Sequence, residues 1–166
     1  MNRVSLLLAF AVSLSFCAPP AHAKAYFAGK REMVGWSVAI AVVEVGKVEE
    51  VDVKGEHWTY RQRATAKVKD VLKGELPKEV TLYGQETFIC AQCKLTEGTH
   101  LVFLKKDGDK WVGSNWQLSI RPISEDKVEW YVDAKSALDQ KPAPLKDVLA
   151  EVRQLGKDEP KTEPVS

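Results

Sequence analysis

Two cysteines, Cys90 and Cys93, form the pattern in this sequence with the clearest capacity for chemistry. A C-x-x-C pair can work as a thiol–disulfide redox centre, supply half of a metal site or form a short disulfide. A redox pair normally begins a helix that lowers the pKa of its first thiol, and no helical pattern follows Cys93. Residue 94 is lysine, whereas covalent haem attachment requires histidine there. We therefore predict a structural Cys90–Cys93 disulfide; thiol–disulfide exchange and free or metal-bound thiols are the alternatives.

Zinc binding is the second chemistry that these cysteines allow. His57 and His100 would complete a set of four ligands of the types that zinc prefers. However, the spacing from Cys93 to His100 matches no common zinc motif, and His100 lies inside an apolar, strand-like segment. We therefore predict no metal site, and no other pattern in the sequence indicates a cofactor.

The segment Gly55–Arg63 combines aromatic and cationic side chains: His57, Trp58, Tyr60, Arg61 and Arg63. Such side chains at a hairpin tip can stack on bases or sugars. Alternatively, the aromatic rings cover the end of a barrel while the arginines stay in solvent. We take these five residues, together with the loop that carries the cysteines, as the candidate binding surface.

The sequence contains no arrangement typical of a known class of enzyme. It has no G-x-S-x-G motif, no H-E-x-x-H motif and no P-loop. Its carboxylates follow the pattern of solvated strand faces and turns. We therefore expect a non-enzymatic protein, and a thiol oxidoreductase is the enzymatic alternative.

Large aromatic residues are dense toward the C-terminal end, at Trp111, Trp116, Trp130 and Tyr131. Large rings most often pack in a core, and an exposed subset would instead mark an interaction patch. The sequence leaves both possibilities open.

The elements that must position these residues are mainly β-strands. Residues 34–53 are rich in β-branched side chains, apolar at first and alternating later, which predicts a long strand. Residues 54–58 carry a turn. The following run alternates between small apolar and polar side chains, as in a half-buried antiparallel strand. Shorter strands are predicted at 80–83 and 99–106, with tight turns at Asp107–Asp109 and Ser124–Asp126.

A helix is predicted near the end of the chain, because apolar residues there repeat at helical spacing. They are Leu145, Val148, Leu149, Val152 and Leu155, between Pro144 in the first turn and Gly156 at the stop. The whole pattern predicts a mainly β fold: a small closed or partly open Greek-key barrel of the OB type, with five to six strands and a C-terminal α-helix. An antiparallel sandwich is the alternative.

The first residues predict a secretory signal peptide. Arg3 precedes an apolar run over residues 4–16, and the small-x-small triplet at 21–23 follows a Pro-Pro break. The run is shorter than the roughly 20 residues that a membrane-spanning helix needs. We predict cleavage after Ala23 and a periplasmic or secreted protein. Lipidation at Cys17 is disfavoured, because the residue before it is bulky.

Charge argues against a polyanionic partner. The chain has 24 lysines and arginines against 23 acidic residues, and Arg3 is the only charged residue in the signal peptide. The exported chain would therefore be neutral, which gives no overall attraction to nucleic acid or anionic lipid. We expect a protein partner and no membrane span. The expected organisation is a signal peptide (1–23), one barrel domain with its helix (24–156) and a disordered tail (157–166).

The order of these segments resembles the netrin-like domain of the tissue inhibitors of metalloproteinases and their bacterial relatives. The resemblance covers residues 34–113, and its marks are V-L-K-G at Val71–Gly74 and a cysteine followed by L-x-x-G-x-x-L-V-F-L at Leu95–Leu104. It implies a five-stranded OB-type barrel. In the animal inhibitors an N-terminal cysteine chelates the protease zinc, whereas cleavage after Ala23 would leave Lys24 first. The resemblance therefore implies the fold rather than that mode of inhibition.

These observations lead to one expected function and two alternatives. We expect an exported, non-enzymatic binding or inhibitor-like module that acts through the first-hairpin tip and the loop carrying the cysteines. The alternatives are a periplasmic thiol–disulfide redox protein that uses the C-x-x-C pair, and a binder of oligonucleotides or glycans on the OB face. The sequence does not predict the oligomeric state or the identity of the partner.

Overall fold

The computed structural model describes residues 25–88, 90–133 and 136–158. The predicted signal peptide (1–23), Cys17 within it, and residues 159–166 of the predicted tail lie outside the described residues. In the described part of the chain, no helix is both long enough and apolar enough to cross a membrane.

The described residues form eight strands, two α-helices and one short 3-10 helix. In chain order the elements are α1 (Lys30–Trp36), β1 (Ala39–Lys54), β2 (Thr59–Lys73), β3 (Glu79–Glu86), β4 (Gly98–Asp107), β5 (Lys110–Gly113), η1 (Trp116–Leu118), β6 (Ile120–Ser124), β7 (Lys127–Tyr131), β8 (Gln140–Pro144) and α2 (Leu145–Lys157).

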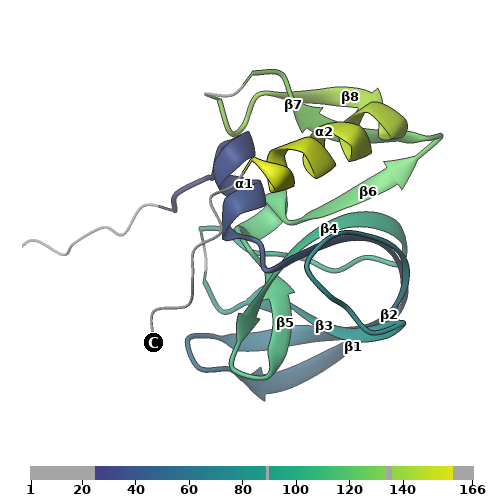
Figure 1. Ribbon diagram of the computed structural model, residues 1–166. Coiled ribbons are helices and arrows are strands. Elements are labelled where there is room, and N and C mark those ends of the chain that lie inside the picture. The colour runs from purple at the N-terminus through teal and green to yellow at the C-terminus, as the bar shows by residue number, and fades with distance from the viewer. Residues whose placement is uncertain (1–24, 89, 134–135, 159–166) are drawn as a thin grey trace, which may run out of the picture.

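Strands β1 to β5 curve into a partly closed barrel in the lower part of Figure 1. The order β1-β2-β3-β5-β4 returns to its start, because β1 also pairs with β4. One strand pairing in this ring covers few residues: β3 and β5 run parallel and pair only at Leu82–Trp111 and Tyr83–Val112. The predicted fold class is confirmed, since the chain is mainly β with a partly closed barrel, compatible with the OB type, and a C-terminal helix.

The long strand β1 takes part in two hydrophobic cores, which explains why its first half is continuously apolar. Successive side chains of a strand point to opposite faces. Ile40 and Val42 pack beside the helices, whereas Ala41, Val43 and Val45 pack inside the barrel. The side chains of β4 divide between the same two cores.

Strand β2 has one buried and one exposed face, as its alternating pattern predicts. Ala64 and Ala66 are buried inside the barrel and Val68 is half-buried, whereas Thr65 and Lys67 are exposed. The tip of the β1–β2 hairpin falls between Lys54 and Thr59, at the predicted turn.

Strands β6 to β8 extend the sheet beyond the barrel, and both helices pack on this part of the molecule (Figure 1). Trp130 and Tyr131 of β7 are buried here with Val148 and Val152 of α2. These two rings therefore pack in the core. The predicted C-terminal helix is present as α2, but Pro144, predicted in its first turn, is the N-cap. The helix continues past the predicted stop at Gly156 to Lys157, so the first residue of the predicted tail is helical.

Arg121 is buried in the same region with 3% of its surface exposed. Its guanidinium donates hydrogen bonds to the backbone oxygens of Leu118 and Glu129 and to the side chain of Gln140. It also lies 4.6 Å from the ring centroid of Tyr131. The side chain of Arg121 therefore links β6 to η1, β7 and β8 by hydrogen bonds.

The number of strands and the start of the first strand differ from the expectation. Residues 34–36 end helix α1, and β1 begins only at Ala39. Glu32 in the first turn of α1 accepts a hydrogen bond from the Gly29 amide at 2.9 Å, which satisfies one of the free amides at a helix start. The sequence does not predict strand β8, because its two prolines disfavour a strand. Proline is tolerated there because β8 is an edge strand that pairs only with β7 among the described strands.

Candidate binding cleft

The two arginines of the hairpin tip lie on the outer, solvent-exposed face of the hairpin. Arg61 pairs with Asp52 at 2.6 Å, and Arg63 pairs with Glu49 at 2.7 Å. Both acids belong to β1 of the same hairpin. The arginines therefore stay in solvent and do not share one surface with the aromatic residues of the tip.

Asp107, at the end of β4, holds the hairpin tip in place. Its carboxylate accepts hydrogen bonds from the backbone amide of His57 at 3.1 Å and from the Tyr60 hydroxyl at 2.8 Å, and it lies 2.6 Å from His57 Nδ1. Burial opposes ionisation of Asp107, but the hydrogen bonds from His57 and Tyr60 outweigh this effect and lower its pKa. Burial and the same carboxylate raise the pKa of Tyr60 far above its usual value.

Three aromatic rings from distant parts of the chain meet next to this anchored tip. Trp58 comes from the tip, Phe88 from the start of the cysteine-bearing loop and Trp116 from η1. Their ring centroids are 5.5 Å apart for Trp58–Phe88, 5.7 Å for Trp58–Trp116 and 5.1 Å for Phe88–Trp116. These distances are typical of favourable aromatic contacts. The hairpin tip and the cysteine-bearing loop thus meet at these rings.

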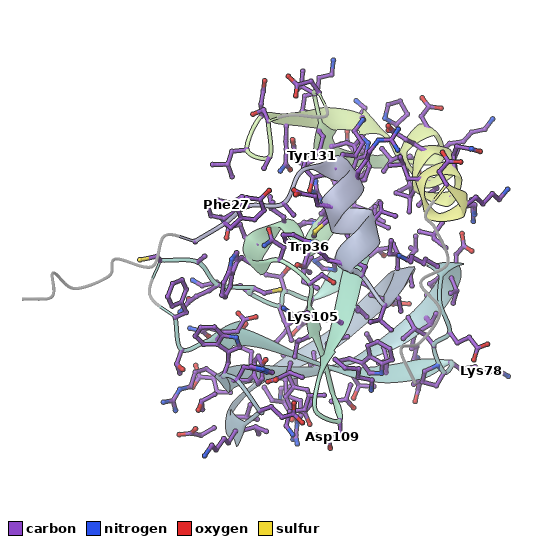
Figure 2. All side chains as sticks on the ribbon, turned by 60° about the vertical axis from the view of Figure 1, so that its left-hand side comes forward. Phe27, Trp36, Lys78, Lys105, Asp109 and Tyr131 are labelled. Carbon is purple, nitrogen blue, oxygen red and sulfur yellow. The ribbon has the colours of Figure 1, made fainter. Side chains whose placement is uncertain are left out.

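A second aromatic pair lines the same surface cleft as these three rings. Tyr26 and Trp36 have ring centroids 5.6 Å apart and are 57% and 45% exposed. Together the five rings line a cleft with a volume of about 360 Å³, whose lining also includes Tyr60, Glu86, Lys105 and residues 112–115. We call it the aromatic cleft; Trp36 and Lys105 are labelled in Figure 2.

Glu86 is the buried acid of the aromatic cleft, with 3% of its surface exposed. Its Oε2 accepts a hydrogen bond from the Cys93 backbone amide at 2.8 Å. Burial raises the pKa of Glu86, and the Cys93 amide and Lys105 oppose this shift. A buried acid with a perturbed pKa in a cleft is a typical mark of a functional site.

Two residues at the cleft have unusual backbone conformations. Trp116 has a φ of 46°, and Gln85, next to Glu86, has a φ of 53°. Residues other than glycine seldom adopt this left-handed conformation, and such strain concentrates at functional sites. Trp116, one of the cleft rings, is thus carried by a backbone conformation that tryptophan seldom adopts.

The predicted Cys90–Cys93 disulfide is absent from the structure, where both are free cysteines. Cys93 is fully buried in the barrel core, whereas Cys90 is exposed to solvent. The Cys93 Sγ lies so close to the backbone that a Cβ placed on Gly113 would be 2.7 Å from it. The two thiols therefore point into different surroundings. Burial and the nearby Glu86 raise the pKa of Cys93, which keeps its thiol protonated.

The histidines considered as zinc ligands lie apart from the cysteines. His100 is buried, with Nε2 at 2.9 Å from Thr96 Oγ1 and Nδ1 at 2.9 Å from the Gly98 oxygen. Within the ranges that the structure describes, one group has metal-ligand spacing: Glu56, His57 and Asp107. It contains none of the other three candidate ligands.

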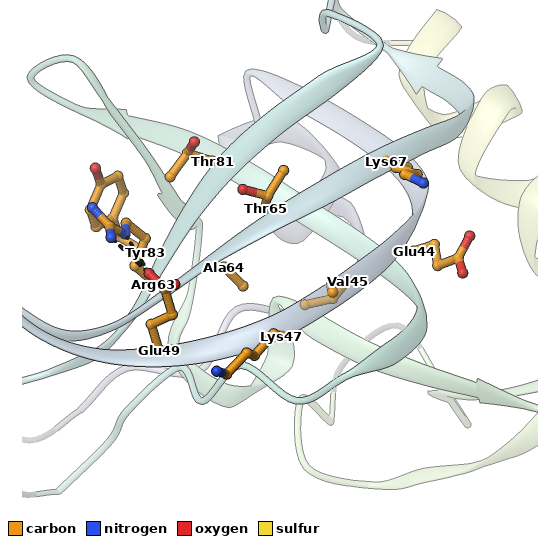
Figure 3. Close-up of a pocket in the computed structure, with 11 residues that line it drawn as sticks. Glu44, Val45, Lys47, Glu49, Arg63, Ala64, Thr65, Lys67, Thr81 and Tyr83 are labelled. Atoms are coloured by element: carbon orange, nitrogen blue, oxygen red, sulfur yellow. Dashed lines mark hydrogen bonds and ion pairs between the residues drawn. The ribbon is translucent and has the colours of Figure 1, made fainter.

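A second hollow, of about 620 Å³, runs over the outer face of β1, β2 and β3 (Figure 3). Its lining includes Lys47, Thr65 and Tyr83 as well as the Arg63–Glu49 ion pair, which Figure 3 marks with a dashed line. We call it the outer groove. Arg63 is the member of the predicted site that lines it.

Sequence reasoning found Trp58 and Tyr60 of the aromatic cleft and missed most of the rest. Tyr26, Trp36 and Glu86 carry no local motif, because they come together only through the fold. The sequence pattern assigns Trp36 to the predicted strand at 34–53, and the structure places it at the end of α1 instead, so its position at the cleft could not be read from the sequence.

No family model matches this chain, and no curated protein is significantly similar to it. The resemblance to the netrin-like domain therefore stays a prediction.

Proposed function

We propose that this protein is an exported, non-enzymatic binding or inhibitor-like module that captures another protein in the aromatic cleft. The observation that carries the proposal is the contact between Trp58 of the hairpin tip and Phe88 of the cysteine-bearing loop, 5.5 Å apart, with Trp116 beside both. Tryptophan and other large rings dominate the binding energy of protein interfaces.

The cleft is also held in shape before any partner arrives. Trp58 follows His57, whose amide is fixed on Asp107, and the three rings support one another. A preorganised surface loses less conformational entropy on binding than a flexible one. This rigidity supports a role in recognition.

The titratable groups at the cleft favour binding over catalysis. The Cys93 thiol is buried and its pKa is raised, which opposes formation of the nucleophilic thiolate. Glu86 has its Oε2 engaged by a backbone amide. Among the described residues, no hydrogen bond pairs either group as a nucleophile with a base, the contact on which covalent catalysis depends.

A pull-down with two matched variants tests the proposal. The chain from residue 24 is immobilised and exposed to periplasmic extract, alongside Trp58→Ala, which alters the aromatic cleft, and Tyr83→Ala, which alters the outer groove. We expect Tyr83→Ala to retain the captured protein and Trp58→Ala to retain at least tenfold less, a loss of about 1.4 kcal/mol or more. Both variants are checked for folding by urea denaturation. Equal capture by Trp58→Ala, or loss confined to Tyr83→Ala, would refute the proposal.

A further inference from the structure

We infer that the aromatic cleft receives a lysine or arginine side chain of the partner protein, with Glu86 as its counter-charge. This inference rests on the proposed function and names the chemistry that the cleft selects.

The first argument is the state of Glu86. Burial of a carboxylate is costly unless an opposite charge or several hydrogen bonds compensate it. The Cys93 amide donates a hydrogen bond to Oε2 at 2.8 Å, and the amide of Glu86 itself and the charge of Lys105 also favour the ionised form, but burial outweighs them and raises the pKa of Glu86. A cation that enters the cleft would supply the missing charge, whereas a neutral or acidic group would add to the cost.

The second argument is the ring content of the cleft. Six aromatic side chains, Tyr60 included, share the cleft with this carboxyl group. The faces of aromatic rings attract cations, most strongly when the contact is removed from water. Rings and a carboxylate together therefore form a site that distinguishes a cation from a neutral group of the same shape.

Lys105 is the charge that opposes this reading, because it lines the same cleft (Figure 2). Its side chain is exposed, and no hydrogen bond or ion pair joins it to Glu86 among the described contacts. Lys105 already favours the ionised form of Glu86, so it competes with an incoming cation. Solvent screens its exposed charge much more than a buried one, which leaves Glu86 able to attract a cation that is removed from water.

The surroundings of the cleft favour a side chain carried by a protein over a small free amine. Tyr26 and Trp36, which line the cleft, are 57% and 45% exposed. Large exposed apolar side chains next to a cleft are typical of protein-interaction surfaces. A basic residue flanked by apolar groups would use both the cleft and this rim.

Binding of capped tripeptides tests the inference directly. The probes are acetyl-Gly-X-Gly-amide peptides in which X is arginine, lysine, glutamate or citrulline, the last being a neutral analogue of arginine. Binding is followed by NMR shifts of the Trp58 and Trp116 indole N–H groups, which line the cleft. We expect the arginine and lysine peptides to bind at least fivefold more tightly than the citrulline peptide, the scale of a cation–π contact near a carboxylate.

Two variants with opposite expected effects make the test specific. Glu86→Gln keeps an acceptor for the Cys93 amide and removes the charge, so it should abolish the preference for arginine over citrulline. Lys105→Gln should strengthen binding of the arginine peptide. Equal binding of arginine and citrulline peptides, an unchanged preference in Glu86→Gln, or tightest binding of the glutamate peptide would overturn the inference.

The arms of the test separate this inference from the proposed function. Choline serves as a free cation; if it binds as tightly as the arginine peptide at the same two indoles, the assignment to a protein side chain is wrong. If Trp58→Ala abolishes protein capture while the peptides show no charge preference, only the present inference fails. If Trp58→Ala captures protein normally, the proposed function fails.

Discussion

Replacement of Asp107 gives the sharpest test of how the aromatic cleft is held together. Asp107→Ala removes the acceptor of the Tyr60 hydroxyl and of the His57 amide, and it leaves the hydroxyl of buried Tyr60 without that partner. Hydrogen bonds to a charged group contribute about 1.5–3 kcal/mol each, and an unpaired buried group costs a similar amount. The His57 side chain is 72% exposed, so we discount its contact with Asp107. The expected loss of unfolding free energy is about 3 kcal/mol for Asp107→Ala.

Asp107→Asn and Asp109→Asn serve as matched comparisons. Asp107→Asn keeps one acceptor oxygen, so we expect a smaller loss of about 1–2 kcal/mol. Asp109 lies on the same turn, and its side chain is 88% exposed. Asp109→Asn should therefore change stability by less than about 0.5 kcal/mol. Urea denaturation followed by tryptophan fluorescence measures all three variants.

The effect of Asp107 should depend on pH in a defined direction. Its folded pKa is lowered, so its ionised form stabilises the fold at pH values above the unfolded pKa of about 3.9, and this contribution is lost as pH falls through the folded pKa. The stability difference between the wild type and Asp107→Asn should thus be largest near pH 6 and shrink at pH 3. A loss below 0.5 kcal/mol for Asp107→Ala, or a gap to Asp107→Asn that does not change with pH, would refute the assigned contacts.

Four further predictions concern buried groups and backbone geometry. In a chain that begins at residue 24, a thiol reagent should modify Cys90 quickly and Cys93 only after denaturation; the absence of any reactive thiol in denaturant without reductant would instead indicate the disulfide. Gly74→Ala should cost more than about 2 kcal/mol, because Gly74 has a φ of 70° and an added Cβ would lie 2.2 Å from a backbone oxygen. Gly156 lies in α2 with open space around it, and alanine favours a helix more than glycine does. Gly156→Ala should therefore stabilise the protein by about 0.5–1 kcal/mol, and the same urea denaturation assay measures both glycine variants. Arg121→Lys should lower the unfolding free energy by about 2–4 kcal/mol, since an ammonium cannot reproduce the three hydrogen bonds of the buried guanidinium; a stability within 0.5 kcal/mol of wild type would contradict this role.

The elements with a clear local pattern were predictable from the sequence. The alternation of Ala64, Thr65 and Ala66 identifies both faces of β2, and the spacing of Val148 and Val152 identifies the buried side of α2. In these segments each residue's environment depends on its own element and the layer beneath it. Pattern and structure therefore agree.

The aromatic cleft was only partly predictable, because its parts are far apart in the sequence. Tyr26, Phe88 and Trp116 belong to three separate segments, and none of them follows a recognised motif. The absence of the Cys90–Cys93 disulfide has a related cause. Spacing alone allows the bond, but the fold directs Cys93 into the barrel core, where a protonated thiol packs as a small apolar group.

The short parallel contact between β3 and β5 makes the barrel wall unequally stiff. Every other neighbouring pair in the ring shares at least four paired positions, whereas this one pairs at Leu82–Trp111 and Tyr83–Val112. Glu86, three residues after Tyr83, and Gly113, directly after Val112, line the aromatic cleft. Local opening therefore costs least beside the cleft, and the amide hydrogens of β5 should exchange with solvent sooner than those of β1. The β3–β5 pairing is thus the least secured part of the barrel wall, whereas the β1–β2 hairpin is held along most of its length.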